Sequence, residues 1–208
     1  QIELPTESLV ALYERSVAEA GDSVATEFFG RTTTYAELGD QIERAAEALR
    51  RLGVGAGDRV ALVLPNCPQG VVAFYAVLRL GAVVVQHNPL YTDRELAHIF
   101  TDHGARVAIC WDVAVPKLQQ MPATAPLRTI VSVNLLNAFP LVKRLALALP
   151  LPQLRATRAK LTAPVSGTIA WETLLQAPPI ASDHPRPAVH DMAAILYTSG
   201  TTGLPKGA

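Results

Sequence analysis

Short apolar runs alternate with segments of helical periodicity along most of the chain. Five of the runs lack polar alternation and are rich in aliphatic residues, which is typical of strands buried on both faces of a parallel sheet. They lie at residues 60–64, 82–85, 107–110, 130–133 and 193–197. Because helical segments separate them, the pattern predicts an α/β fold with parallel-sheet layers and flanking helices.

Two of the predicted helices begin with a capping box, in which a Thr hydroxyl and a Glu carboxylate satisfy each other's backbone N–H groups. The boxes occupy residues 34–37 and 92–95, and the apolar periodicity that follows each one stops at Gly53 and at Gly104. Glycine is common just past the end of a helix. A third helix is expected from Pro68, between the first two strands.

The periodic pattern weakens between residues 140 and 187, where eight of the 16 prolines fall. Proline interrupts both helix and sheet, so this Pro- and Arg-rich stretch is predicted to be an excursion from the domain. One short helix is expected in it, over 141–149. At the other end of the chain, residues 7–20 are expected to form a helix packed outside the sheet.

The charge of the chain is balanced overall but not along its length. Eighteen basic and 18 acidic residues cancel, which argues against a nucleic-acid binder. From Val113 to Trp171, however, there are seven basic residues and no acidic one. The basic segment 141–160 can contact an anionic membrane through a short amphipathic helix at 141–149, or that helix can simply pack on the domain. The cysteines Cys67 and Cys110 are expected to be buried, reduced thiols.

The most informative motif follows the strand at 193–197. Glycines in a loop of small hydroxyl residues allow the backbone N–H groups to converge on an anion, and a phosphate is the anion that suits such a loop best. The residues expected to hold the phosphates are Thr198, Ser199, Gly200, Thr201, Thr202, Gly203 and Lys206. For Lys206, a structural role in closing the loop is an equal alternative to phosphate contact.

The spacing excludes a Walker A loop, which needs four residues between its first glycine and a Gly-Lys-Ser/Thr sequence. Here Gly200 and Gly203 are only three apart, and Lys206 is followed by Gly207. Instead, Tyr-Thr-Ser-Gly-Thr-Thr-Gly-Leu-Pro-Lys-Gly at 197–207 resembles the signature of the adenylate-forming superfamily. That superfamily includes acyl-CoA synthetases, aryl-CoA ligases, luciferases and peptide-synthetase adenylation domains.

The resemblance extends over essentially the whole chain. Thr-Tyr-Ala-Glu-Leu at 34–38 resembles the opening motif of these enzymes, and Asn-Pro-Leu-Tyr-Thr at 88–92 resembles fatty-acyl-CoA and coumarate-CoA ligases. The Arg- and Pro-rich excursion looks most like bacterial long-chain fatty acyl-CoA ligases. Residues 1–208 would then be the N-terminal part of the AMP-binding (adenylation) domain, and the C-terminal domain with its lysine is expected to lie beyond Ala208.

In that family, ATP and a carboxylate give an acyl-adenylate and pyrophosphate, and coenzyme A then displaces AMP to form a thioester. The resemblance implies that residues 198–203 grip the β- and γ-phosphates and that Thr198 helps to hold Mg²⁺. It places no catalytic residue within this chain, so the 208 residues alone are expected not to form a thioester.

The predicted function is therefore activation of a fatty acid, in the cytoplasm or at the periphery of a membrane. The expected partners are the fatty acid, ATP and CoA. Two alternatives stay open. The acid could instead be an aryl acid of the coumarate type, since the residues that line the carboxylate pocket in the family lie past Ala208. The chain could also be a non-catalytic fragment that retains the fold.

Overall fold

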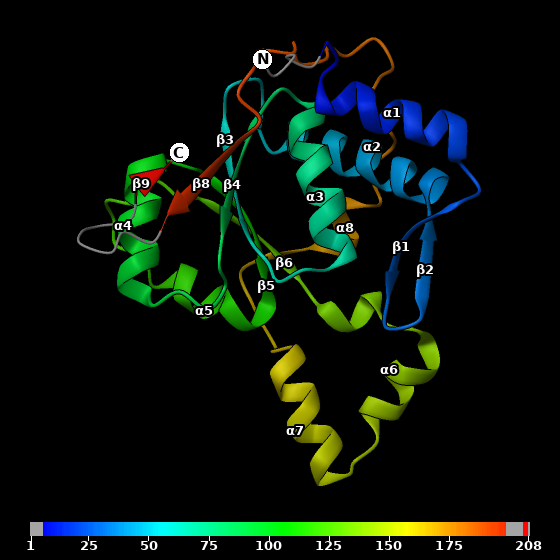
Figure 1. Ribbon diagram of the computed structural model, residues 1–208. Helices are drawn as coiled ribbons and strands as arrows, with labels where there is room; N and C mark the ends of the chain where they lie inside the picture. The colour runs from blue at the N-terminus through cyan, green and yellow to red at the C-terminus, as the bar shows by residue number, and fades with distance from the viewer. Residues whose placement is uncertain (1–5, 199–205, 208) are drawn as a thin grey trace.

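The computed structural model describes residues 6–198 and 206–207. Its centre is a seven-stranded sheet of order β7-β6-β5-β3-β4-β8-β9 (Figure 1). All neighbouring pairs run parallel except β8 and β9, so the predicted parallel α/β fold is confirmed. The strands are β3 (Arg59–Val63), β4 (Val83–His87), β5 (Val107–Trp111), β6 (Thr129–Val133), β7 (Ile169–Ala170), β8 (Ala194–Thr198) and β9 (Lys206–Gly207).

Helices cover both faces of this sheet, which explains why its strands are apolar on both sides. Successive residues of β3 alternate between two cores, with Leu62 in one and Ala61 and Val63 in the other. The first core is covered by α1 (Leu9–Ala20), α2 (Tyr35–Arg51), α3 (Pro68–Arg79) and α8 (Trp171–Leu174), and the second by α4 (Asp93–His103) and α5 (Val115–Gln119). The expected outer helix is α1, which packs on α2 and α3 (Figure 1).

Both predicted capping boxes are present. At the start of α2, Thr34 Oγ1 accepts from the backbone N–H of Glu37 at 3.2 Å, and Glu37 Oε2 accepts from that of Thr34 at 2.9 Å. Thr92 and Glu95 repeat the arrangement at the start of α4, with 3.3 and 2.8 Å. Gly104 ends α4 in the left-handed conformation, with φ of 69°. These local signals therefore fix where both helices start.

An antiparallel hairpin, β1 (Val24–Phe28) and β2 (Arg31–Thr34), was not predicted. Its two-residue turn, Phe29–Gly30, has positive φ at both positions, 53° and 88°. Asn-Gly is the usual signal for such a turn, and phenylalanine gives none. The ring of Phe29 stacks on that of Phe139, with centroids 4.4 Å apart, which helps to hold this uncommon backbone conformation.

The stretch 140–187 is more ordered than its prolines suggest. The short helix expected there is α6 (Leu141–Ala148), but a second helix, α7 (Pro152–Leu161), follows it. Proline at the first position of α7 costs no helical hydrogen bond. After α7 the chain rejoins the sheet, because β7 pairs with β6 and Trp171 is buried in the core. The part that leaves the body is therefore α6 and α7 (Figure 1).

Arg79, which interrupts an apolar stretch of the sequence, is completely buried at the end of α3. Its Nε lies 3.3 Å from Glu43 Oε1 on α2 and 3.8 Å from Glu14 Oε1 on α1. Nη1 donates to the carbonyl of His184 at 3.3 Å, and the hydroxyl of Tyr13 donates to Glu43. One buried guanidinium thus links α1, α2, α3 and the chain that leads to β8.

Both cysteines are buried and unpaired, as the sequence analysis expects. Burial raises the pKa of Cys67 to about 11, so this thiol stays protonated at neutral pH. Within the described ranges, no helix combines the length and the apolar character that a transmembrane span requires.

Candidate nucleotide-binding site

The strand that leads to the predicted phosphate loop lies inside the sheet. β8 pairs in parallel with β4, with Val84 opposite Ala194, Val85 opposite Ile195 and Gln86 opposite Leu196. The carboxyl ends of β3, β4 and β8 therefore meet at one edge of the sheet (Figure 1). Doubly wound sheets bind their ligands at this edge.

The two ends of the loop are held together. Thr198 at the end of β8 is the Cα partner of Lys206 on β9, and Tyr197 is the partner of Gly207. Residues 199–203 lie outside the described part of the chain, and so do the side chains of Thr198 and Lys206. Their contacts with phosphate stay a prediction, but the short ladder at the base brings the first and last of the candidate residues side by side.

Gly207 closes this ladder tightly over β8. A Cβ at this position would lie 2.9 Å from Ile195 Cγ2 and 3.3 Å from Tyr197 Cζ, which is too close for any side chain without movement. The last glycine of the motif is therefore required for packing rather than for an unusual backbone conformation. It lets β9 return across the ring of Tyr197.

Tyr197 anchors the end of β8 to α4. Its hydroxyl donates to Asp102 Oδ2 at 2.5 Å. Burial, reinforced by the hydrogen bond to this carboxylate, raises the pKa of Tyr197 well above its usual value. Neither residue was among the predicted site residues. Tyr197 belongs to the motif, but Asp102 lies 95 positions earlier and no sequence signal connects the two.

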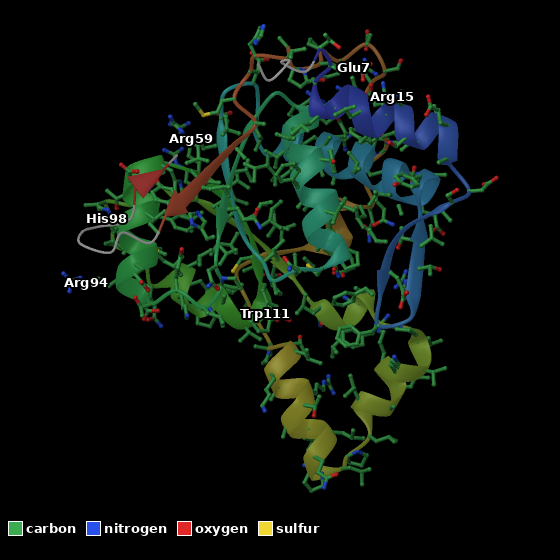
Figure 2. All side chains as sticks on the ribbon, viewed as in Figure 1. Glu7, Arg15, Arg59, Arg94, His98 and Trp111 are labelled. Atoms are coloured by element: carbon green, nitrogen blue, oxygen red, sulfur yellow. The ribbon has the colours of Figure 1, made fainter. Side chains whose placement is uncertain are left out.

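Two histidines pack beside this anchor. The ring centroid of His87 lies 5.0 Å from that of His103 and 6.0 Å from that of Tyr197. Burial lowers the pKa of His87 to about 3 and that of His103 to about 4, so both imidazoles are neutral in the folded protein. Both rings are buried and therefore act as packing residues. His98, by contrast, lies on the half-exposed side of α4 (Figure 2).

A cavity of about 330 Å³ opens where β3 and β4 end. β3 continues into a helix on one face of the sheet and β4 into a helix on the other, so the cavity lies at the point where the connections diverge. Mostly apolar side chains line it, including Leu64, Pro65, Cys67, Val71, Phe74 and Tyr75, with Asn66 and Gln86 as polar groups. Leu196, the Cα partner of Gln86, is 54% exposed on the neighbouring strand β8.

The groups present suit a nucleotide better than a metal ion on its own. Hydroxyl, ammonium and backbone N–H donors in the loop match the oxygens of a triphosphate. Mg²⁺ in such sites usually binds one or two carboxylates together with the phosphates. The described residues offer no group of three or more His, Cys, Asp or Glu side chains that could hold a metal ion. Asp102 Oδ2 already accepts a hydrogen bond from the hydroxyl of Tyr197.

A doubly wound α/β sheet with a Gly/Thr loop between two paired strands at its carboxyl edge is an arrangement that nucleotide-binding proteins use. The family model described as "AMP-binding enzyme" matches residues 13–208. The chain belongs to this family of adenylate-forming enzymes.

Curated relatives whose names state different substrates are about equally similar in sequence to this chain. A long-chain-fatty-acid–CoA ligase of Bacillus subtilis (strain 168) is 33% identical over 212 residues, which cover 100% of this chain and 37% of the relative. 4-Coumarate–CoA ligase 3 of Oryza sativa subsp. japonica is 34% identical, over 86% of this chain and 27% of its own length. The chain thus spans less than two fifths of the length of each of these relatives.

Solved structures support the fold. The anthranilate CoA ligase AuaEII, in complex with anthranoyl-AMP, superposes with a TM-score of 0.79 at 23% identity, over 98% of this chain and 35% of the other. A long-chain-fatty-acid-CoA ligase from Archaeoglobus fulgidus gives a TM-score of 0.71 at 20% identity, over 100% and 37%. At these identities the likeness is one of fold.

Proposed function

We propose that this chain is the N-terminal part of the adenylation domain of an ATP-dependent acyl-CoA ligase, and that the loop after β8 holds the phosphates of ATP. The observation that carries the proposal is the pairing of Thr198 with Lys206 at the carboxyl edge of the sheet, within a family of AMP-binding enzymes. The activity belongs to the whole enzyme, of which these residues form one part.

Within such an enzyme, the residues of this chain bind and orient rather than react. The loop 198–203 would grip the β- and γ-phosphates, and Lys206 would either offset their charge or close the loop. Thr198 would contribute one oxygen toward Mg²⁺, which neutralises phosphate charge when it is bound. This reaction needs no protein nucleophile. It is accelerated by holding the carboxylate in line with the α-phosphorus and by balancing the charge of pyrophosphate. Coenzyme A would then accept the acyl group.

For the acid itself, we propose a fatty acid, with an aryl acid of the coumarate type as the second candidate. An apolar cavity beside β8 suits the apolar part of either one. The relatives do not separate the two, since a fatty-acid ligase and a coumarate ligase are 33% and 34% identical to this chain. Pyrophosphate exchange by the full-length enzyme, driven by palmitate or by coumarate, distinguishes them.

The phosphate-loop proposal has a test of its own. ATP is expected to raise the melting temperature of the protein, because a ligand stabilises the state that it binds. Replacing Thr198 and Lys206 by Ala is expected to abolish that shift. If ATP causes no shift in the unaltered protein, the alternative of a non-catalytic fragment with a retained fold is favoured. A shift that both substitutions leave intact would place the nucleotide elsewhere.

We further propose that the enzyme acts in the cytoplasm, at the periphery of a membrane. A long-chain fatty acid partitions into lipid, since each buried CH₂ group gains about 0.8 kcal/mol. An enzyme that uses such an acid therefore benefits from a location at the lipid surface. The basic segment 141–160 is the part of this chain that suits such a contact.

A further inference from the structure

The helices α6 and α7 form a hairpin that projects from the body of the molecule (Figure 1). None of their residues is buried. Both ends of the hairpin are nevertheless fixed. Lys143 Nζ donates to the carbonyl of Phe29 at 2.7 Å, and Trp111 Nε1, on the strand beside the base of α7, donates to the carbonyl of Leu161 at 2.8 Å (Figure 2). The projection is therefore built into the fold.

The orientation of α6 is the reverse of that of an ordinary surface helix. Leu141 and Leu145 are four residues apart and form with Val142 one apolar side of the helix, and Leu149 directly follows its last residue. The exposed fraction is 66% for Leu141, 62% for Leu145, 50% for Leu149 and 78% for Val142. The charged Lys143 instead points back and bonds the body of the protein. An apolar side that faces water costs free energy unless something covers it.

The stretch of sequence that contains this apolar side carries only positive charge. From Val113 to Trp171 the chain contains no Asp or Glu. Arg155, Arg158 and Lys160 on α7 are exposed, and none of them forms an ion pair with another described residue. The exposed turn at Phe29, 54% accessible, adds a large apolar side chain next to α6.

We propose that the α6–α7 hairpin docks this protein on an anionic lipid bilayer. The leucines of α6 would enter the boundary between headgroups and acyl chains, and the cations of α7 would lie against the lipid phosphates. Stable attachment of a peripheral protein takes two such signals, an apolar one and a basic one, and the hairpin supplies both. A second copy of the chain is a poorer occupant, because two basic surfaces would face each other.

The test uses sedimentation with vesicles, in the absence of ATP and acid, so that it reports on the surface and not on ligase chemistry. The unaltered protein is expected to sediment with vesicles of phosphatidylcholine mixed with phosphatidylglycerol, and to be released by high salt. Pure phosphatidylcholine should retain much less of it. Changing Arg155, Arg158 and Lys160 to Glu should lower binding by at least about tenfold, since each cation near the surface contributes roughly one factor of five.

A second variant tests the apolar side separately. Replacing Leu141, Leu145 and Leu149 together by Ser should weaken binding to the anionic vesicles. The binding that remains should depend on salt as it does in the unaltered protein. The controls are Leu90→Ser and Arg94→Glu, which change exposed residues before and on α4, away from the hairpin (Figure 2). All of these side chains are exposed, so the fold should survive, and circular dichroism verifies this for each variant.

Three results would overturn the proposal. One is equal sedimentation with charged and uncharged vesicles. Another is a loss of binding in the controls as large as that in the hairpin variants. The third is a self-association of the unaltered protein that the leucine substitutions abolish while vesicle binding stays the same, which would assign the apolar side to a second copy. None of these outcomes depends on whether the protein activates a fatty acid, so the ligase proposal stands or falls separately.

Discussion

The hydroxyl of Tyr197 lies 2.5 Å from the carboxylate of Asp102, and this contact ties the last strand before the predicted phosphate loop to the helix α4. Tyr197 directly precedes Thr198, so the hydrogen bond fixes the position from which the loop starts. The same carboxylate and the two buried histidines surround the ring of Tyr197.

Tyr197→Phe removes this bond and leaves the ring. A hydrogen bond to a charged group contributes roughly 1.5–3 kcal/mol, and partial exposure places the expected loss of unfolding free energy near the lower end. Urea denaturation measures it. The matched control is Tyr75→Phe, because the Tyr75 hydroxyl has no described hydrogen-bond partner. Equal losses in the two variants would contradict an anchoring role for Tyr197.

Gly207→Val is expected to displace β9 from β8, because its Cβ would lie 2.9 Å from Ile195 Cγ2. Overpacking of this kind costs about 1–3 kcal/mol. Because the strand closes the loop, the ATP-dependent rise in melting temperature should also shrink. Gly55→Ala serves as the control, since a Cβ there meets only Asp58 Oδ2 at 3.9 Å. A normal response to ATP in the Gly207 variant would show that β9 is not needed to close the site.

Acid should destabilise the protein through its buried histidines. Above pH about 6.5 the two histidines are neutral in the folded and in the unfolded protein, so they do not reduce the free energy of unfolding. As the pH falls, the unfolded chain takes up protons, whereas the folded protein does so only near 4 at His103 and near 3 at His87. The free energy of unfolding should therefore drop by up to about 1.4 kcal/mol per pH unit for each histidine.

This dependence is best measured by urea denaturation between pH 6.5 and 5, before the carboxylates titrate. His87→Leu should lower the slope by roughly half, whatever it does to the stability at neutral pH. A slope that does not change in this variant would mean that His87 is not the source.

The pair of Arg79 and Glu43 should behave unlike an exposed ion pair. Glu43→Leu leaves a fully buried guanidinium whose one remaining carboxylate partner, Glu14, lies 3.8 Å away, so a loss of about 3 kcal/mol is expected. Arg79→Met should cost less, because the glutamates it releases are partly exposed. Arg15→Met breaks the exposed pair with Glu7 and should change the stability by less than about 1 kcal/mol. Denaturation midpoints rank the three variants, and a reversed order would refute this account.

The sequence predicts the parts of the fold that depend on local signals. Both capping boxes and the five apolar runs lie where the helices and parallel strands are found. The hairpin of β1 and β2 was missed because Phe29 occupies a turn position that usually requires Asn or Gly. β7 was missed because it has only two residues, and the neighbouring Trp171 becomes a core residue only through tertiary packing.

For the site, the order of residues in the loop leads to the prediction of phosphate binding, which stays a prediction, and it gives no sign of the residues that support the loop. Asp102 lies on α4, and its relation to Tyr197 exists only once β8 has joined β4. The tight approach of Gly207 to Ile195 likewise depends on the antiparallel return of β9. Contacts between segments that lie far apart in the sequence produce no fixed spacing of residues, so no sequence motif reveals them.

The pairing of β8 with β4 also has a consequence for how the protein is made. On the ribosome, β3, β4, β5 and β6 are complete long before Ala194 emerges, so β4 waits as an uncovered edge strand. Val83, Val84 and Val85 then present an apolar β-strand with free hydrogen-bonding groups, which favours aggregation. A pause in synthesis before β8 emerges is therefore the stage at which the folding chain should be most prone to aggregate.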